Sequence, residues 1–360
     1  MDILDKFETL TNLGNSILNF YGIGKFHDSY KKLDDLLANN KDKKICLVLF
    51  DGFGKNIIEK YKDDIPYIYS HIYSTFNSIY PPTTVAATTA LTTGKYPCET
   101  GLLGWNQNFK ELNAYVDVFL NRDKVKDKKL DIDMRKDILK PVFIDKLINA
   151  HFNKECASFI HSFEYKSIDQ FFFKVDETLK TNIFTYAYCA EPDHLMHQEG
   201  TSTKNVRNTI IILEDRLKRL VESNKDTLFI LVADHGFVDI ENIYIKEDKE
   251  LIETLKDKDA TFSIEGRFAS FEVEDKEKFI EIYNKRYKEY FVLKTKEEIL
   301  DEHYFGYGEE HPLFKSFLGD FFLLSKSKYN LADSDDFKLN GAHAGITKEE
   351  KELYMMIFNS

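Results

Sequence analysis

The chain has 360 residues and a formal net charge of −12, with hydrophobic residues at 43% and aromatic residues at 14%. This length predicts one large domain with an insertion, or two domains, and the apolar content is enough for a packed core. The acidic balance excludes polymeric nucleic acid as a partner, because it would repel a phosphate backbone. A small anion is still compatible with the chain if its charge is neutralised locally.

The N-terminus and the cysteines bear on the compartment. The first ten residues carry acids where a signal peptide needs bases, and no apolar run approaches the roughly 18 residues of a membrane span. The four cysteines show no CxxC spacing, and three of them lie in or beside apolar runs, which favours buried free thiols: Cys46, Cys98, Cys156 and Cys189. These features predict a soluble cytoplasmic protein with no membrane partner. The sequence leaves the oligomeric state open.

In chain order, residues 1–42 come first, with apolar positions at helical spacing that predict a helical lead-in: Ile17, Leu18, Phe20, Leu33, Leu36 and Leu37. The apolar run from Ile45 to Phe50 then ends at Asp51-Gly52, as a strand buried on both faces would. The segments ECASFIH, TNIFTYAY, DTLFILVADHG and DFFLLS repeat this signature, and residues 206–221 have helical period. This alternation predicts an α/β fold with a doubly wound, mostly parallel sheet between helices.

Two regions interrupt this alternation. One is the charged stretch of residues 124–137, and the other runs from residue 241 to about residue 311. The second region contains ATFSIEGRFASFEVE, which alternates like strands, and a helix-like segment over residues 276–290. We therefore predict a core formed by residues 43–240 and 319–360, with a small α+β cap over residues 241–318.

Acidic and imidazole side chains follow the predicted strands. In an open α/β sheet, ligands bind at the carboxyl ends of the strands, so side chains that follow the apolar runs should converge. Three carboxylates and three imidazoles are a ligand set suited to Zn²⁺ or another transition metal, and are enough for two ions. The candidate ligands are Asp51, Asp193, His197, Asp234, His235 and His343.

Each candidate also has an ordinary explanation when it is taken alone. Asp51 could be a turn-forming residue, and Asp193 with His197 could be a helix cap and a surface histidine. The adjacent Asp234 and His235 are harder to explain, because two ionisable groups at a buried strand end cost desolvation energy unless they are paired. The prediction of a metal site therefore depends on all of these residues occurring together.

One further stretch, SIYPPTTVAATTALTTGKYPCETGLLGWN, contains Thr84, a run of small residues, and Thr93-Gly94. Together with the early DG at Asp51, PDxxxHxxG from Asp193 to Gly200, DHG from Asp234 and the late His343, it completes five ordered motifs. This set resembles the nucleotide pyrophosphatase/phosphodiesterase branch of the alkaline phosphatase superfamily. The motifs extend over most of the chain, from residue 44 to residue 347.

The resemblance implies an alkaline phosphatase-like fold that holds two metal ions, usually zinc, with Mn²⁺ or iron as alternatives. Asp193, His197 and His343 would hold the first ion. Asp51, Asp234 and His235 would hold the second ion, together with the oxygen of Thr84. Thr84, rather than Thr83, would be the nucleophile of a hydrolase that cleaves a phosphodiester or pyrophosphate bond of a small soluble substrate, such as a nucleotide derivative, through a phosphothreonine intermediate.

The chain departs from the family pattern near this nucleophile. Trp105 stands where many members have a phosphate-contacting asparagine, and Asn106 follows it, so we expect one of these two residues to contact the substrate. Core packing is the ordinary explanation for Trp105. Residues 85–93 contain no Arg or Lys, which favours diesters over dianionic monoesters unless Arg267 or Lys95 reaches the site.

Other functions are compatible with the same motifs. The chain could be a phosphomonoesterase or phosphotransferase of the same superfamily, or a metal-stabilised protein that binds a phosphorylated ligand without cleaving it. A sulfatase would need Cys or Ser in place of Thr84, and the similar mutases use Ser. The substrate cannot be read from the loop and cap residues 106–139 and 241–318.

Overall fold

A computed structural model describes residues 8–334 and 338–359 of the chain. The first seven residues of the expected helical lead-in lie outside this part, as do residues 335–337 and 360 of the expected core. Among the helices of the described residues, none is both long and apolar enough to cross a membrane. The four cysteines are buried and form no disulfide.

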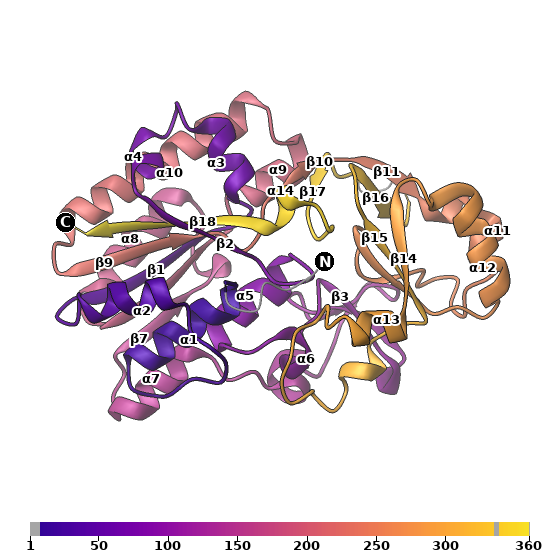
Figure 1. Cartoon of the computed structure of the whole chain (residues 1–360), viewed down its shortest axis with the longest axis horizontal. Helices are drawn as coiled ribbons and strands as arrows, with labels where there is room; N and C mark the ends of the chain where they lie inside the picture. Colours follow the sequence, from indigo (N-terminus) through magenta and orange to yellow (C-terminus); the bar gives the residue numbers. More distant parts are fainter. Residues whose placement is uncertain (1–7, 335–337, 360) are drawn as a thin grey trace.

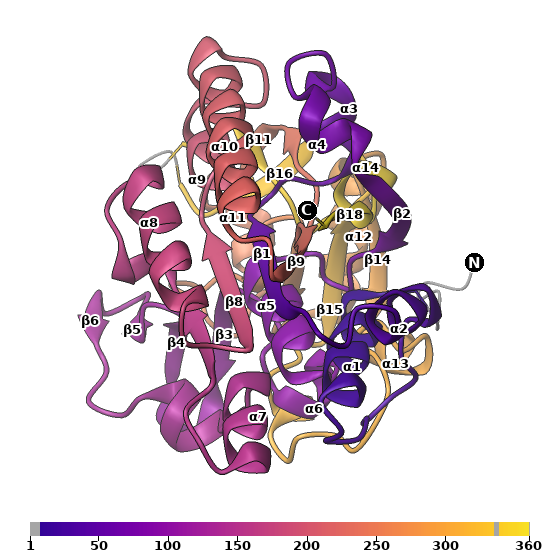
Figure 2. The same ribbon diagram turned by 90° about the vertical axis from the view of Figure 1, so that its left-hand side faces the viewer.

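The main sheet has six strands among the described residues, in the order β2-β18-β9-β1-β8-β7. Strands β9, β1, β8 and β7 are parallel, and β18 runs antiparallel to both of its neighbours, β2 and β9. Figure 2 shows β8, β1 and β9 of this sheet side by side. Their bounds are β1 Lys44–Phe50, β2 Ile72–Asn77, β7 Ala157–Ile160, β8 Phe184–Cys189, β9 Thr227–Val232 and β18 Glu352–Asn359.

Helices cover both faces of this sheet, as the alternation of apolar runs and helical periods predicts (Figure 1). On one face lie α1 Leu10–Phe20, α2 Lys31–Ala38, α5 Thr84–Thr93 and α7 Ile144–Phe152. On the other lie α3 Lys55–Tyr61, α4 Pro66–Ser70, α8 Ile168–Leu179 and α10 Lys204–Ser223. The fold is therefore the doubly wound, mostly parallel α/β sandwich expected from the sequence.

The helical lead-in packs directly on the main core. Leu10, Leu13 and Ile17 of α1 are fully buried, and Asn15 Nδ2 donates a 2.8 Å hydrogen bond to the carbonyl of Gly94 at the end of α5. Gly94 has a φ of 70°, in the left-handed region that glycine adopts at the end of a helix. Helix α1 therefore fixes the helix that begins at Thr84.

A second sheet lies at the other end of the molecule (Figure 1), with eight strands among the described residues, in the order β14-β15-β13-β12-β3-β4-β5-β6. All of its strand pairs are antiparallel. Strands β3 to β6 and β15 lie outside residues 241–318, so this sheet extends beyond the expected cap. The bounds are β3 Asn106–Phe109, β4 Ala114–Asp117, β5 Arg122–Asp123, β6 Lys128–Lys129, β12 Ser263–Glu265, β13 Phe268–Phe271, β14 Phe291–Thr295 and β15 Phe321–Ser325.

The prediction that DFFLLS forms a strand of the main sheet is wrong, because it forms β15 of the second sheet. Phe322 and Leu324 of β15 pack into the main core, while Phe321 and Leu323 pack into a second core with α11 and α12. A strand between two apolar cores is buried on both faces. It therefore has the same continuous apolar run as a strand of a parallel sheet.

Short elements complete the cap and the connections. The remaining helices are α6 Pro97–Thr100, α9 Asp193–Glu199, α11 Lys249–Ile252, α12 Lys276–Ile282, α13 Lys296–Asp301 and α14 Lys348–Lys351. Strand β10 Val238–Asp239 pairs with β17 Gly341–Ala342, and β11 Glu241–Tyr244 pairs with β16 Tyr329–Ala332. The β10–β17 pair brings the segment that carries His343 to the carboxyl end of β9.

Candidate metal centre and active site

The carboxyl ends of β1 and β8 bring the first two acids together. Asp51 follows β1, and Asp193 is the first residue of α9, after β8. Gly52, which follows Asp51, has a φ of 68°, and a Cβ at this position would lie 3.0 Å from the Cβ of Asp193. The DG turn therefore needs its glycine for two reasons, the left-handed backbone and the close approach of Asp193.

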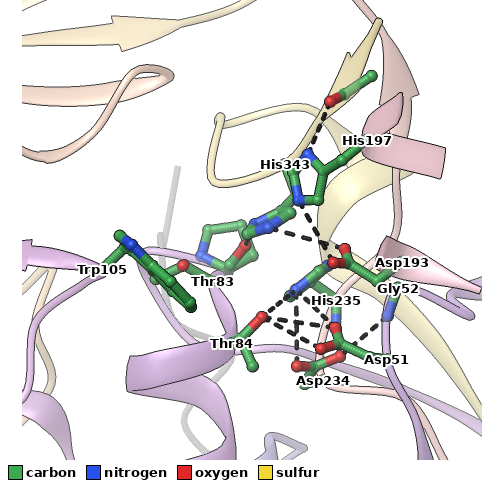
Figure 3. Close-up of polar contacts among 12 residues, drawn as sticks. Asp51, Gly52, Thr83, Thr84, Trp105, Asp193, His197, Asp234, His235 and His343 are labelled. Carbon is green, nitrogen blue, oxygen red and sulfur yellow. Dashed lines mark hydrogen bonds and ion pairs between the residues drawn. The ribbon is translucent and has the colours of Figure 1, made fainter. Parts of the chain in front are cut away.

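The third acid, Asp234, follows β9 and is fully buried. Its Oδ1 accepts hydrogen bonds from the backbone N–H of Gly52 at 3.2 Å and of His235 at 3.1 Å. The side chains of Asp234 and His235 are therefore fixed against the DG turn. In Figure 3 these residues converge with Asp51 and Asp193 on one place.

The three histidines share one hydrogen-bonding arrangement. The Nδ1 atoms of His197, His235 and His343 lie 2.9, 3.0 and 3.1 Å from the backbone carbonyls of Gly341, Gly236 and Pro82, respectively. A carbonyl oxygen only accepts, so each Nδ1 carries a proton, and in the neutral ring Nε2 keeps its lone pair. Metal-binding histidines are oriented in this way by their outer nitrogen.

The candidate ligands form two groups, and within each group the ligand atoms all lie within 4.8 Å of one another. One group is Asp51, Asp234 and His235, and the other is Asp193, His235 and His343. The first is the set expected for the second ion. The other contains His235 where the sequence interpretation has His197, whose Nε2 lies 3.3 Å from Asp193 Oδ2, one helical turn away on α9.

The buried acids fit a bound cation. Asp193 Oδ1 and Asp234 Oδ2 are buried and accept no hydrogen bond from the described residues. Buried carboxylate oxygens are costly unless a cation or a donor satisfies them. Carboxylate and imidazole ligands together suit a divalent transition metal, so the residues present fit a metal centre.

The pKa values of Asp51 and Asp234 indicate a lack of positive charge around these two acids. Burial, followed by the neighbouring carboxylates, raises the pKa of Asp51 and of Asp234 above the usual range. Burial also acts to lower the pKa of His197, but the carboxylate of Asp193 outweighs it and raises this pKa to about 9. Protein groups alone therefore do not balance the three acids, which favours divalent cations at this position.

Thr84 is the first residue of α5, and its hydroxyl faces the metal centre. Thr84 Oγ1 lies 3.1 Å from His235 Nε2 and 3.4 Å from Asp51 Oδ1 (Figure 3). The later hydroxyls of Thr88 and Thr92 instead donate to the carbonyl four residues earlier, each at 2.6 Å. Because Thr84 starts the helix, it has no preceding helical turn to bond, so its hydroxyl can point out of the helix.

The other residues singled out near the nucleophile make their hydrogen bonds outside the groups of candidate metal ligands. Thr83 donates its hydroxyl to Glu265, and Trp105 lies on the Thr83 side of the cluster in Figure 3. Asn106 Nδ2 donates to Asp117 Oδ1 at 3.2 Å, within the second sheet. Trp105, which is partly exposed, is therefore better placed than Asn106 for a substrate contact.

Two cations that the sequence analysis considered do not join the metal centre. The guanidinium of Arg267 is fully buried against Glu350, and the Lys95 ammonium lies 4.7 Å from the centre of the Phe26 ring. Neither residue makes a contact with Thr84. The arrangement therefore contains the acids and imidazoles that were expected, and neither Arg267 nor Lys95 is placed to bind a phosphate dianion there.

Sequence reasoning missed two residues beside the site. Tyr188 donates its hydroxyl to Asp51 Oδ2, and Glu265 accepts hydrogen bonds from Thr83 and from the backbone N–H of Trp105. Tyr188 could have been found, because it lies near the carboxyl end of a strand that leads to Asp193. Glu265 gave no signal, since it lies in a hairpin of the cap far along the chain.

Known structures share this arrangement of sheets and helices. Mouse ectonucleotide pyrophosphatase/phosphodiesterase 5, as an inactive variant in complex with AMP, matches with a TM-score of 0.63 at 17% identity, covering 87% of each chain. The human protein of the same name matches with a TM-score of 0.62 at 17% identity, covering 88% of this chain and 87% of that one. At this identity the likeness establishes the fold alone.

The sequence itself identifies the family. None of the curated proteins matches the chain. The family profile described as type I phosphodiesterase / nucleotide pyrophosphatase matches residues 123–345, which is more than half of the chain. The chain therefore belongs to the type I phosphodiesterase/nucleotide pyrophosphatase family and is a hydrolase of phosphoric ester bonds.

Proposed function

We propose that the chain hydrolyses a phosphodiester or pyrophosphate bond of a small phosphorylated substrate, such as a nucleotide derivative, with two divalent metal ions and a phosphothreonine intermediate. The position of the Thr84 hydroxyl carries this proposal, because it faces both groups of candidate ligands from the start of a helix. A purely structural metal site has no use for a buried hydroxyl at this place.

Seven residues would hold the ions. Asp193, His197 and His343 would hold one ion. The other ion would be held by Asp51, Asp234 and His235, together with the oxygen of Thr84. His235 lies in both groups of ligand atoms and can serve either ion. Zn²⁺ is the metal we propose, with Mn²⁺ or iron as alternatives. When bound, the ions would favour the ionised form of Thr84 and would stabilise the negative charge that develops on the leaving group.

The covalent steps then follow from the residues. Thr84 Oγ loses its proton to solvent and forms a bond to phosphorus, while the bond from phosphorus to the leaving oxygen breaks. The leaving group departs as a phosphate, or takes a proton from solvent and departs as an alcohol. Water attacks the same phosphorus in the second step, so that the Thr84 Oγ–phosphorus bond breaks and the hydroxyl is restored. The amino end of α5 supplies N–H groups and a positive dipole end on the side where the phosphate would lie.

Phosphodiesters are preferred over monoesters in this proposal. Arg267 and Lys95 make their contacts away from Thr84, so neither cation would balance the second negative charge of a phosphomonoester. A phosphomonoesterase or phosphotransferase is the alternative enzyme. A cytoplasmic location also stays a proposal, which the four buried, unpaired cysteines support.

The test compares metal-loaded wild type with Thr84→Ala on bis(4-nitrophenyl) phosphate. We expect turnover to fall by at least about a thousandfold, because the nucleophile is removed. Elemental analysis should find two ions per wild-type chain. Thr92→Ala is the matched control, since its hydroxyl lies on the same helix and bonds only backbone carbonyls.

Each alternative has its own outcome in this experiment. If the wild type cleaves the monoester 4-nitrophenyl phosphate faster than the diester, the chain is a monoesterase. Metal-replete protein that cleaves neither ester would be a binding protein. Diester turnover that survives in Thr84→Ala would show that another group is the nucleophile.

A further inference from the structure

A carboxylate of the cap contacts Thr83, the residue that precedes the nucleophile. Glu265 is the last residue of β12, and its Oε1 accepts hydrogen bonds from the Thr83 hydroxyl and, at 3.0 Å, from the backbone N–H of Trp105. Thr83 directly precedes Thr84 and is the N-cap residue of the same helix. Glu265 is therefore the acid that the cap presents at the amino end of α5, where a phosphate would bind.

Glu265 is distinct from the metal ligands. It belongs to neither group of ligand atoms, and it reaches the site from the second sheet rather than from the strand ends of the main sheet. Both of its hydrogen-bond partners are donors, which suits an ionised carboxylate. Burial raises its pKa, while these two donors and then the imidazoles of His197 and His235 act to lower it.

The hairpin that carries Glu265 is fixed to the rest of the molecule. Arg267, two residues further along, forms a fully buried ion pair with Glu350. The backbone carbonyl of Gly266 also accepts a 2.9 Å hydrogen bond from the N–H of Leu331. A carboxylate on such an anchored turn keeps its position relative to Thr83, so its charge acts on whatever binds at Thr84.

The charges at the site decide what this carboxylate does. Two divalent ions are balanced by Asp51, Asp193, Asp234 and an ionised Thr84, so the centre without Glu265 is neutral. Glu265 then adds one negative charge beside the phosphate. Repulsion by this charge acts about twice as strongly on a phosphomonoester dianion as on a diester monoanion.

We propose that Glu265 is a specificity-determining residue, whose negative charge beside Thr83 selects phosphodiesters against dianionic phosphomonoesters. This inference rests on the proposed function, and it assigns the selection to the cap. Specificity of this kind arises from repulsion of the wrong substrate.

The experiment replaces Glu265 by glutamine, which keeps an oxygen that can accept the hydrogen bonds of Thr83 and Trp105 and removes only the charge. Values of kcat/KM are measured for bis(4-nitrophenyl) phosphate and 4-nitrophenyl phosphate, which share a leaving group, with zinc-loaded wild type and E265Q. We expect the ratio of monoester to diester kcat/KM to rise about tenfold, mainly through the KM of the monoester. The inhibition constant of inorganic phosphate should fall by a similar factor.

Two control variants separate charge from structure. Glu265→Asp keeps the charge and should leave the ratio close to that of wild type. Glu281→Gln removes an equal charge from the exposed side of α12 and should change nothing. If E265Q does not fold, as judged by thermal unfolding, Glu265→Ala removes the same charge and takes its place.

The result that overturns the proposal is an unchanged ratio in the charge-removing variant, or an equal fall of kcat/KM for both esters. Failure of the proposed function looks different, because wild type would then cleave neither ester. In that case calorimetry of inorganic phosphate binding to zinc-loaded wild type and E265Q still decides the role of Glu265. Equal affinities would overturn it, and tighter binding by E265Q would support it.

Discussion

The buried ion pair between Arg267 and Glu350 gives the sharpest prediction about stability. Arg267 donates to both carboxylate oxygens of Glu350, at 2.6 and 2.8 Å, and to the carbonyls of Ser327 at 2.7 Å and Tyr329 at 2.9 Å. Both side chains are fully buried. Substitution of Arg267 by methionine, which has a similar length and no charge, removes all of these hydrogen bonds at once.

The size of the effect follows from what Arg267→Met leaves behind. Glu350 keeps two donors, the backbone N–H of Gly345 and the hydroxyl of Thr347, each at 2.7 Å, but it has lost its counter-charge inside the protein. Removal of one partner from a buried ion pair costs about 3–5 kcal/mol, because the other charge stays buried. Total free energies of unfolding are about 5–15 kcal/mol, so this is a large fraction.

The assay is urea unfolding of wild type, Arg267→Met, Glu350→Gln and the double variant. We expect the double variant to lose clearly less free energy of unfolding than the two single losses added together, with a coupling of about 1–3 kcal/mol. Arg207→Met, which breaks the exposed pair with Asp64, is the control and should lose much less. The reasoning is refuted if Arg267→Met loses no more than this control, or if the two single losses add.

Two further predictions concern pH and metal. Burial acts to raise the pKa of Asp320, but hydrogen bonds from Lys276, Val273 N–H and Lys256 hold it at about 2. Because this folded pKa lies below the unfolded value of about 3.9, the contribution of the carboxylate is complete above that value and is lost as pH falls towards 2. Asp320→Asn should therefore lower the free energy of unfolding by roughly 1–2 kcal/mol at pH 7 and by less at pH 3 in urea titrations, and equal losses would contradict this. Removal of metal by a chelator should lower Tm, and zinc at about 100 times its Kd should restore about 2.7 kcal/mol of the free energy of unfolding. A Tm that responds to neither treatment would argue against a metal centre at Asp51, Asp193 and Asp234.

Strand-end reasoning found the residues of the candidate metal centre because it depends only on topology. Parallel strands end at one edge of the sheet, so acids that follow β1, β8 and β9 must meet there. Asp51, Asp193 and Asp234 do so, although Asp51 lies more than a hundred residues before the other two. Which histidine completes each group depends on distances of about an ångström, and these are not encoded in the order of motifs.

The assignment of strands to sheets was the part that sequence reasoning handled least well. An apolar run shows that a strand is buried on both faces, but two different environments produce it. Strands β1 and β9 lie between layers of helices, whereas β15 lies between the main core and the second core of the cap. Strand β18 was not expected, although its residues 353–358 form a continuous apolar run.

Contacts between the cap and the core were outside the reach of the sequence. Arg267 was considered as a phosphate ligand, and its guanidinium instead pairs with Glu350, 83 residues away. Glu265 lies two residues before it and reaches Thr83, 182 residues away. Of these two residues of one turn, Arg267 thus anchors the hairpin and Glu265 reaches the candidate site. Only the folded structure shows which residue has which role.

The Glu350 side chain explains why the cap and the metal centre form one structural unit. Its carboxylate binds Arg267 of the cap hairpin and the N–H of Gly345, two residues after His343. Its backbone carbonyl accepts a 2.8 Å hydrogen bond from the N–H of Gly236, next to His235. The same residue therefore fixes the hairpin that presents Glu265 and the two segments that present His235 and His343. A shift of the cap cannot leave the candidate ligands in place, so the proposed selection of the substrate and the proposed binding of metal would depend on the same buried contacts.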